Sequence, residues 1–422
     1  MGSNRTYFRT RDAFDRFGCP PPPRQRSAAG LVNALADAYE RGWQPADVLH
    51  VTRRALGAAT APTAAAALLF HAHATEAHFR APREWREQLE QIADREPEAA
   101  RFADGLPPRC TPDDFGAALD AANWQIGVRD WVALSVHWLE LPRLTYLCDP
   151  PSRWPERRDD SAASPRETGG GSADGGSADG GSADGGSADV DPKLLGRIRG
   201  LLAKAEATEF VEEAETFTAK AQDLMTRYAI GAALLHGADA PGSSTIRSRR
   251  IHLDSPYVRE KVHLLTAIGE ANRARTVWFD RFAIATVVGD PIDLRQIDLL
   301  FMSLLVQATR AMHEAGARSP ADSRTASFRK AFLFGFAVRI GQRLKEADSR
   351  ATAETAVDAD VRIDDLLPVL AARSAAVDAE FERLFPSTRA ARSRSVDAHG
   401  WNAGQTAADG ASLAPGERAI AR

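Results

Sequence analysis

The chain has 422 residues, of which 44% are hydrophobic and 26% charged, and its formal net charge is −4. This length exceeds one ordinary hydrophobic core, so two or more domains are expected. The net charge excludes a generally basic, histone-like protein. The part before Val190 holds 21 basic and 27 acidic residues, against 32 and 30 from Val190 onward. This asymmetry favours an anionic partner for the second part, though only slightly.

The cysteine spacing and the length of the apolar runs indicate the cellular compartment of the protein. Cys19, Cys110 and Cys148 are widely spaced and form neither a CxxC motif nor a disulfide framework. Residues 1–11 contain arginine but lack the apolar run of a signal peptide. The longest apolar stretch, residues 64–70, is far shorter than a membrane span. We therefore expect a cytoplasmic protein without membrane contact.

Four consecutive Gly-Gly-Ser-Ala-Asp repeats occupy residues 170–189. Glycine adds backbone entropy, serine and aspartate stay hydrated, and the repeat offers nothing apolar to bury. The sequence therefore predicts a flexible, low-complexity linker over residues 150–190, and a repeat expansion without a selected role would look the same.

The part before the linker is predicted to be helical. Residues 1–27, with their run of prolines, predict a loose arm. Residues 28–149 predict an all-helical domain of unknown type, because proline stands near several expected helix starts and no alternating strand pattern is evident. The expected helices cover residues 28–39, 45–56, 63–79, 82–93, 112–121 and 128–139.

The part after the linker is predicted to be α+β, which makes the whole chain mainly α. Apolar residues at helical spacing predict a helical hairpin over residues 191–235. An α+β domain over residues 250–410 and a loose tail over 411–422 are expected to follow. Within that domain we expect a small β-hairpin, 275–279 and 282–288, and helices over 257–271, 290–312, 327–344, 364–384 and 395–409.

One segment of the second part resembles a known family. The matching motifs are Leu-Leu-Ala-Lys-Ala-Glu at 201–206, Glu-Glu-Ala-Glu at 212–215 and Ala-Lys-Ala-Gln-x-Leu-Met-x-Arg-Tyr at 219–228. Residues from about 193 to 230 thus resemble domain of unknown function 2786, found in bacterial and phage proteins. Residues from about 250 to 410 resemble its usual companion domain. The family implies no reaction, cofactor or catalytic residue, and leaves open the role of its motif residues Lys204, Glu206, Glu213, Lys220 and Gln222.

Two groups of polar residues are candidates for catalytic or metal sites. His71, His73, Glu76 and His78 are dense in potential ligands, but on a helix they point in different directions, and HExxH is absent. The glutamates of the hairpin connection, such as Glu212, fall in a first helical turn, where negative charge favours the helix dipole. We therefore predict no metal, no cofactor and no catalytic residue.

Basic residues form three clusters in the second part, and they carry the functional prediction. If the clusters converged they would follow a phosphate backbone, although arginines on solvated helix surfaces are the simpler interpretation. The clusters are Arg247, Arg249 and Arg250; Arg329 and Lys330; and Arg389, Arg392 and Arg394. We predict a non-enzymatic binding or adaptor protein whose C-terminal part contacts nucleic acid or a nucleic-acid-handling partner. The alternatives are a hydrolase-type enzyme, with a site between the hairpin helices and the small sheet, and a protein–protein interaction module.

Overall fold

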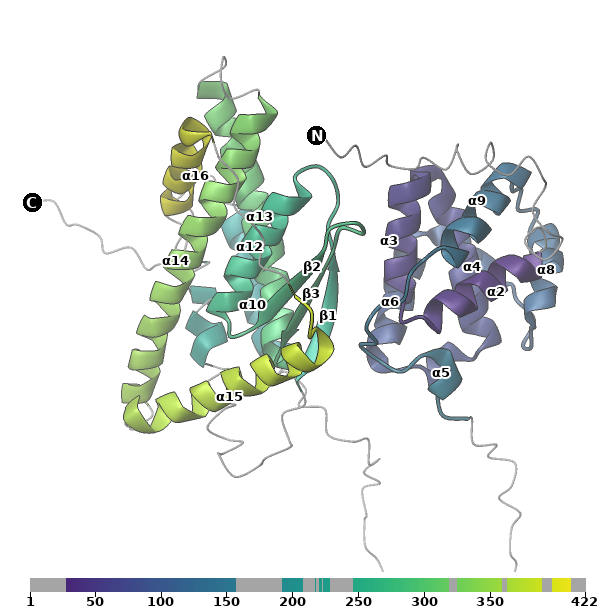
Figure 1. Ribbon diagram of the computed structural model, residues 1–422, viewed down its shortest axis with the longest axis horizontal. Helices are drawn as coiled ribbons and strands as arrows, with labels where there is room; N and C mark the ends of the chain where they lie inside the picture. Colours follow the sequence, from purple (N-terminus) through teal and green to yellow (C-terminus); the bar gives the residue numbers. More distant parts are fainter. Residues whose placement is uncertain are drawn as a thin grey trace, which may run out of the picture. The chain divides into compact units, whose positions relative to one another are not determined.

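The structure is a computed structural model that divides into two compact units, residues 1–186 and 187–422 (Figure 1). It describes residues 28–156, 192–207, 217, 220–221, 223–227, 246–318, 325–358, 363–388 and 397–410. The boundary between the units falls inside the repeat segment. Among the described residues, no helix is both long enough and apolar enough to cross a lipid bilayer. Each unit is considered by itself below.

The N-terminal unit is helical throughout its described part. Proline precedes or opens several helices, where its missing N–H costs no hydrogen bond. The helices are α2 (Ala28–Tyr39), α3 (Pro45–Leu56), α4 (Ala61–Ala74), α5 (Ala77–Arg80), α6 (Arg83–Arg95), α7 (Pro97–Asp104), α8 (Phe115–Ala121) and α9 (Val128–Leu139), with 3-10 turns at Ala58–Thr60, Pro112–Asp114 and Pro151–Arg153. The all-helical prediction is confirmed, whereas α7 was not predicted.

Aromatic side chains fill the core of this unit. Leu35, Trp43, Phe70 and Trp138 are completely buried. Two of these side chains are indoles, and each donates its N–H to an acceptor, as buried Trp N–H groups usually do. Trp138 donates to the Thr52 hydroxyl at 2.8 Å, and Trp43 donates to the backbone carbonyl of Pro142 at 2.7 Å. The α2 helix contacts α4 and α9, and the α3 helix contacts the same two helices, so the four helices enclose this core.

The single helix expected over residues 63–79 is interrupted in the structure. The hydroxyl of Thr75 donates to the carbonyl of His71 at 2.7 Å, and Glu76 adopts a left-handed backbone conformation with φ of 52°. A left-handed residue cannot continue an α-helix. The chain therefore ends α4 at Ala74 and starts the short α5 at Ala77.

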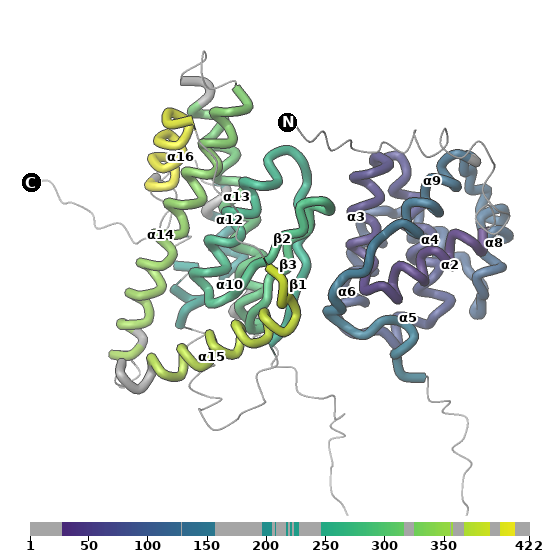
Figure 2. The backbone as a smooth tube through the Cα atoms, viewed as in Figure 1, coloured from purple at the N-terminus to yellow at the C-terminus, as the bar shows by residue number. Residues whose placement is uncertain are grey.

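The C-terminal unit is α+β and combines long helices with a small sheet (Figure 2). Its elements are α10 (Pro192–Ala207), β1 (Arg247–His252), α12 (Val258–Ala271), β2 (Arg275–Phe279), β3 (Ile284–Gly289), α13 (Pro291–Arg318), α14 (Ala326–Asp358), α15 (Ile363–Leu384) and α16 (Ala398–Gly410). The α13 and α14 helices extend beyond their predicted ends at residues 312 and 344. The prediction stopped short because the last turns of both helices are polar and show little apolar periodicity.

The sheet has three antiparallel strands in the order β1-β3-β2. The sequence predicted β2 and β3 as a hairpin but not β1, whose arginines hide the strand pattern. The connection between β2 and β3 runs from Asp280 to Ala283, longer than the expected two-residue turn, and Ala283 has a positive φ of 53°. The central strand β3 is buried along its whole length.

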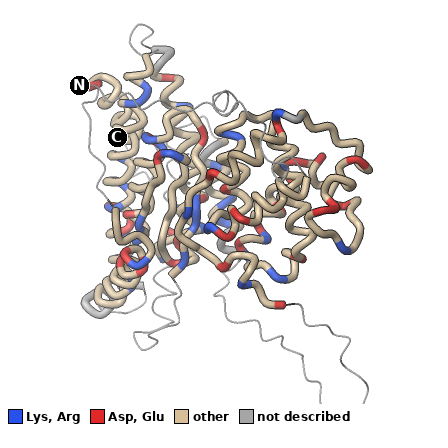
Figure 3. Tube along the Cα trace, turned by 45° about the vertical axis from the view of Figure 1, so that its right-hand side comes forward, with Lys and Arg blue, Asp and Glu red and all other residues tan. Residues whose placement is uncertain are grey.

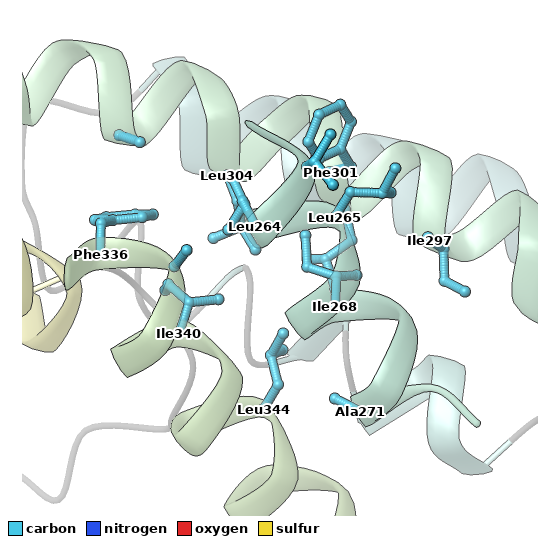
Figure 4. Packing of buried hydrophobic residues seen from close by; sticks show 14 of the residues in the cluster. Leu264, Leu265, Ile268, Ala271, Ile297, Phe301, Leu304, Phe336, Ile340 and Leu344 are labelled. Carbon is cyan, nitrogen blue, oxygen red and sulfur yellow. The ribbon is translucent and has the colours of Figure 1, made fainter. Parts of the chain in front are cut away.

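One hydrophobic core joins the family-like hairpin to the rest of this unit. Figure 4 shows Leu265 and Ile268 of α12 meeting Phe301 of α13 and Ile340 of α14. Ile198 and Leu202 of α10, which are almost fully buried, belong to the same core. The division of the sequence into a hairpin at 191–235 and a companion domain at 250–410 therefore does not separate two cores.

Glycines allow α16 to lie against the first half of α14 (Figure 1). A Cβ at Gly400 would lie 2.6 Å from the carbonyl oxygen of Phe328. A Cβ at Gly404 would collide with the Phe332 carbonyl, and one at Gly335 with the Trp401 carbonyl. Two helix backbones this close need residues without side chains at the contact, so the GxxxG motif at residues 400–404 serves packing within this unit.

Candidate functional site

The basic residues of β1 do not share one surface. Successive residues of a strand point to opposite faces of the sheet. Arg249 lies on the face of the α13 helix, where its guanidinium is 3.3 Å from the carboxylate of Asp298. Arg250 points to the opposite face and is only 8% exposed, whereas Arg247 is exposed at the end of the strand. The structure therefore divides this predicted cluster into three different environments.

The second and third predicted clusters lie elsewhere. Arg329 and Lys330 stand at the start of α14, and Lys330 is exposed. Further along α14, the Arg339 guanidinium pairs with Asp409 of α16 and Arg343 donates to the Ala408 carbonyl, so these two side chains serve helix packing. The third cluster falls outside the described residues; its members are Arg389, Arg392 and Arg394.

Of the five family-motif residues, the structure describes two side chains. Lys204 is exposed, and its ammonium group lies 5.6 Å from the centre of the Phe217 ring, within the range of a cation–π contact. Lys220 is also exposed. The side chain of Glu206 and the residues Glu213 and Gln222 are outside the described part of the chain.

A basic face on α10 emerges from the structure and was not singled out from the sequence. Arg197, Arg199 and Lys204 are all exposed, and within the described residues none of them forms an ion pair. Elsewhere in this unit basic and acidic positions are interspersed (Figure 3). The signal was present in the sequence, because residues 193–204 hold four basic residues and no acidic one.

A second site consists of aspartates and arginines from separate elements. Arg373 of α15 lies 2.9 Å from the carboxylate of Asp290 and 3.8 Å from that of Asp293, at the start of α13. Arg273, in the turn before β2, lies 2.8 Å from Asp348 of α14. We call these five residues the aspartate–arginine cluster. Asp348 also accepts a hydrogen bond from the hydroxyl of Thr226, in the family-like segment, at 3.3 Å.

The electrostatics of this cluster are unusual for carboxyl groups. Burial raises the pKa of Asp293 to about 7, although the guanidinium of Arg373 opposes the shift. Burial also raises the pKa of Asp348, against the opposing charge of Arg273. A carboxyl group that titrates near neutrality is able to give up or accept a proton there. Local sequence patterns do not reveal this cluster, because its arginines and their aspartate partners are 75 or more residues apart along the chain.

The histidine-rich helix of the N-terminal unit is not a convergent site. His71 is buried, its pKa is lowered by burial to about 4, and its ring meets that of Tyr39 edge-on at 5.0 Å. His73 hydrogen-bonds the carbonyl of Pro107 at 2.8 Å, and His78 lies against Phe79. In the described ranges, no group of three or more His, Cys, Asp or Glu side chains is placed to hold a metal ion.

Comparison with known proteins gives one match. No curated protein matches the chain, and no solved structure does. The model of one family, a protein of unknown function (DUF2786), matches residues 193–231. The match includes most of α10 and the described residues of the second hairpin helix, so the basic face of α10 and the Thr226 hydroxyl both lie in the family segment.

Proposed function

We propose that the C-terminal unit is a non-enzymatic, nucleic-acid-binding module that uses the basic face of α10. The observation that carries this proposal is that Arg197, Arg199 and Lys204 are exposed and have no ion-pair partner in the described part of the unit. Unpaired cations on one exposed helix bind phosphates without first giving up an internal partner. Lys220, exposed on the second helix of the same family segment, adds to this surface.

The internal roles of the other arginines support this choice of surface. Arg249, Arg339 and Arg373 are each held by an aspartate of the same unit. A phosphate would have to displace that carboxylate, and losing the internal ion pair would offset much of the free energy gained by binding the phosphate. Arg247 and the pair Arg329 and Lys330 remain as additional contacts. We also propose that residues 250–410 are the companion of the family segment, because α10 packs into their core.

The proposal is tested with the full-length chain. Binding to labelled DNA and RNA is measured by fluorescence anisotropy as the salt concentration rises. The charge variant is Arg197→Gln/Arg199→Gln/Lys204→Gln, and the matched charge control is Arg281→Gln/Arg350→Gln/Arg383→Gln, which removes three exposed basic residues elsewhere in the unit. Each lost phosphate contact lowers the magnitude of the salt slope by about 0.9. The charge variant should therefore lose both affinity and salt dependence, while the charge control keeps them.

The absence of salt-dependent binding by the wild-type chain would contradict the proposal. Equal losses in the charge variant and in the charge control would contradict the choice of α10, because only total charge would then matter.

The aspartate–arginine cluster favours a second candidate function, a hydrolase-type enzyme. The pKa of about 7 suits Asp293 to general acid–base chemistry at neutral pH. The cluster also brings together residues from the turn before β2, the start of α13, α14 and α15. The side chain of Asp293 is only 7% exposed, so a substrate would require α15 to move. Hydrolysis of a model phosphodiester or ester that is lost in Asp293→Asn would support this function, and its absence in the wild type would remove it.

A further inference from the structure

The exposed surface of α10 has a defined arrangement of charge around the helix axis. Arg197 and Lys204 are seven residues apart and therefore lie on the same side. Arg199 follows Arg197 by two residues, which turns it by about 200° to the other side. The buried side chains of Ile198 and Leu202 face the core. The cations thus border the exposed face of the helix on both sides.

The strip of the helix surface between Arg199 on one side and Arg197 and Lys204 on the other consists of residues with small or no side chains. It consists of Gly196, Gly200, Ala203 and Ala207, whose spacing of four, three and four residues places them on one helix face, and all four are exposed. A Cβ added at Gly196 or at Gly200 would meet nothing within 4 Å. Packing within the described part of the unit therefore does not require either glycine.

The described residues of the unit do not explain why α10 carries these two glycines. A glycine inside a helix costs roughly 0.5–1 kcal/mol relative to alanine. Where the same unit uses helix glycines for packing, at Gly335 and Gly404, a Cβ would collide with a neighbouring backbone. The contrast points to a contact between the smooth face of α10 and something other than the described residues of this unit.

We propose that α10 lies in the major groove of a DNA duplex, with its small-residue strip facing the base edges and its cations reaching the phosphates on both walls. This inference rests on the proposed nucleic-acid binding of the same helix. The B-DNA major groove is about 12 Å wide, and a helix with its side chains is about 10–12 Å across. A face of glycine and alanine lets the helix enter deeply enough for short-range contact on both sides.

The cations of α10 and its strip of small residues together favour duplex DNA over other partners. The major groove of duplex RNA is deep and narrow, so a helix cannot enter it. Single-stranded nucleic acid binds through stacking on aromatic side chains, and the exposed positions of α10 hold none. A second copy of the same helix would bring like charges together. Glycine and alanine reach few base atoms, so the duplex is recognised by shape and charge with little sequence preference.

The test uses the full-length chain and three probes of equal length: a DNA duplex, an RNA duplex and single-stranded DNA. The strip variant is Gly196→Leu/Gly200→Leu, which keeps every charge and raises helix propensity, so that the fold is retained. The matched variants are Gly196→Ala/Gly200→Ala, which adds only methyl groups, and Ala353→Leu, which places a leucine at an exposed position of α14. Anisotropy gives the affinity, and analytical ultracentrifugation gives the oligomeric state.

We expect the wild type to bind the DNA duplex most tightly and the strip variant to lose about ten-fold in affinity, equivalent to about 1.4 kcal/mol. Ala353→Leu should bind as the wild type does. Gly196→Ala/Gly200→Ala should fall between the wild type and the strip variant, because methyl groups obstruct the approach less than leucine side chains do. A strip variant that binds duplex DNA as the wild type does, or equal affinity for all three probes, would overturn the major-groove inference while leaving nucleic-acid binding intact. A dimer that dissociates in the strip variant would overturn it in favour of a second copy. No binding to any probe would instead remove the proposed function itself.

Discussion

The guanidinium of Arg373, near the middle of α15, lies 2.9 Å from the carboxylate of Asp290 at the point where β3 passes into α13. This pair fastens α15 across the outer face of the sheet, where the helix adds only a small apolar contact that includes Val288 and Phe385. Figure 1 shows α15 running from the end of α14 to the strands. A second ion pair, from Arg275 of β2 to Asp378 of α15 at 2.5 Å, also holds the helix. The pair between Arg373 and Asp290 is the more deeply buried of the two.

Replacing Arg373 with alanine should destabilise the C-terminal unit by about 3 kcal/mol, because it leaves Asp290 and Asp293 buried without their counter-ion. Hydrogen exchange of peptides from α15 and α13 in urea would measure the change. The matched control is Arg249→Ala, which breaks the more exposed pair with Asp298 and should cost less than about 1 kcal/mol. Similar losses in the two variants would contradict this account of α15.

The stability of the C-terminal unit should fall as the pH rises from about 4 to about 7. The pKa of Asp293 is about 7 in the folded chain and has a reference value of 3.8, so in this range the folded state binds more protons than the unfolded state. Each unit of pKa difference corresponds to about 1.4 kcal/mol. The raised pKa of Asp348 adds a change of the same sign.

Asp293→Asn should flatten this dependence, since an amide mimics the protonated carboxyl group. Unfolding free energies at pH 5 and pH 8 would be compared with those of Asp298→Asn, a change at a partly exposed carboxylate. An unchanged pH dependence in Asp293→Asn would show that another group is responsible.

The packing of α16 on α14 should fail when its glycines gain a side chain. In Gly404→Ala the new methyl group collides with the Phe332 carbonyl, and overpacking of this kind costs about 1–3 kcal/mol. Gly200→Ala adds the same methyl group where nothing lies within 4 Å, so it should stabilise α10 by roughly 0.5–1 kcal/mol. Urea unfolding of both variants would measure the difference, and shifts of the same sign would contradict it.

Acid should weaken the N-terminal unit through His71. Its pKa is lowered by burial to about 4 in the folded chain, from a reference value of 6.5. Between these values the unfolded state takes up a proton that the folded state does not, so stability is lost as the pH falls from about 6.5 to 4. His71→Gln should reduce this loss, with His78→Gln as the exposed control. Tryptophan fluorescence reports on it, since Trp43, Trp85 and Trp138 lie in this core.

The sequence predicted those parts of the fold that local signals specify. Proline and apolar periodicity placed α3 at its observed bounds, and the two strand-like runs identified β2 and β3. The β1 strand was missed because three of its six residues are arginines, which suggest solvent rather than a sheet.

The candidate sites were predictable only in part. The cations of α10 stand close together in the sequence, but their exposure depends on how α10 packs against α13. The aspartate–arginine cluster joins Arg273 to Asp348 and Arg373 to Asp290, residues separated by 75 or more positions. Such pairs are set by tertiary packing, which local periodicity does not encode.

The salt dependence of duplex DNA binding tests the central claim most directly. Affinity would be measured from about 50 to 200 mM salt for the wild type, the charge variant and the charge control. The account predicts that the charge variant loses affinity and that its slope becomes shallower by about 3, while the charge control keeps a slope close to that of the wild type. A charge variant that binds with the wild-type affinity and slope would contradict the assignment of α10 as the nucleic-acid contact.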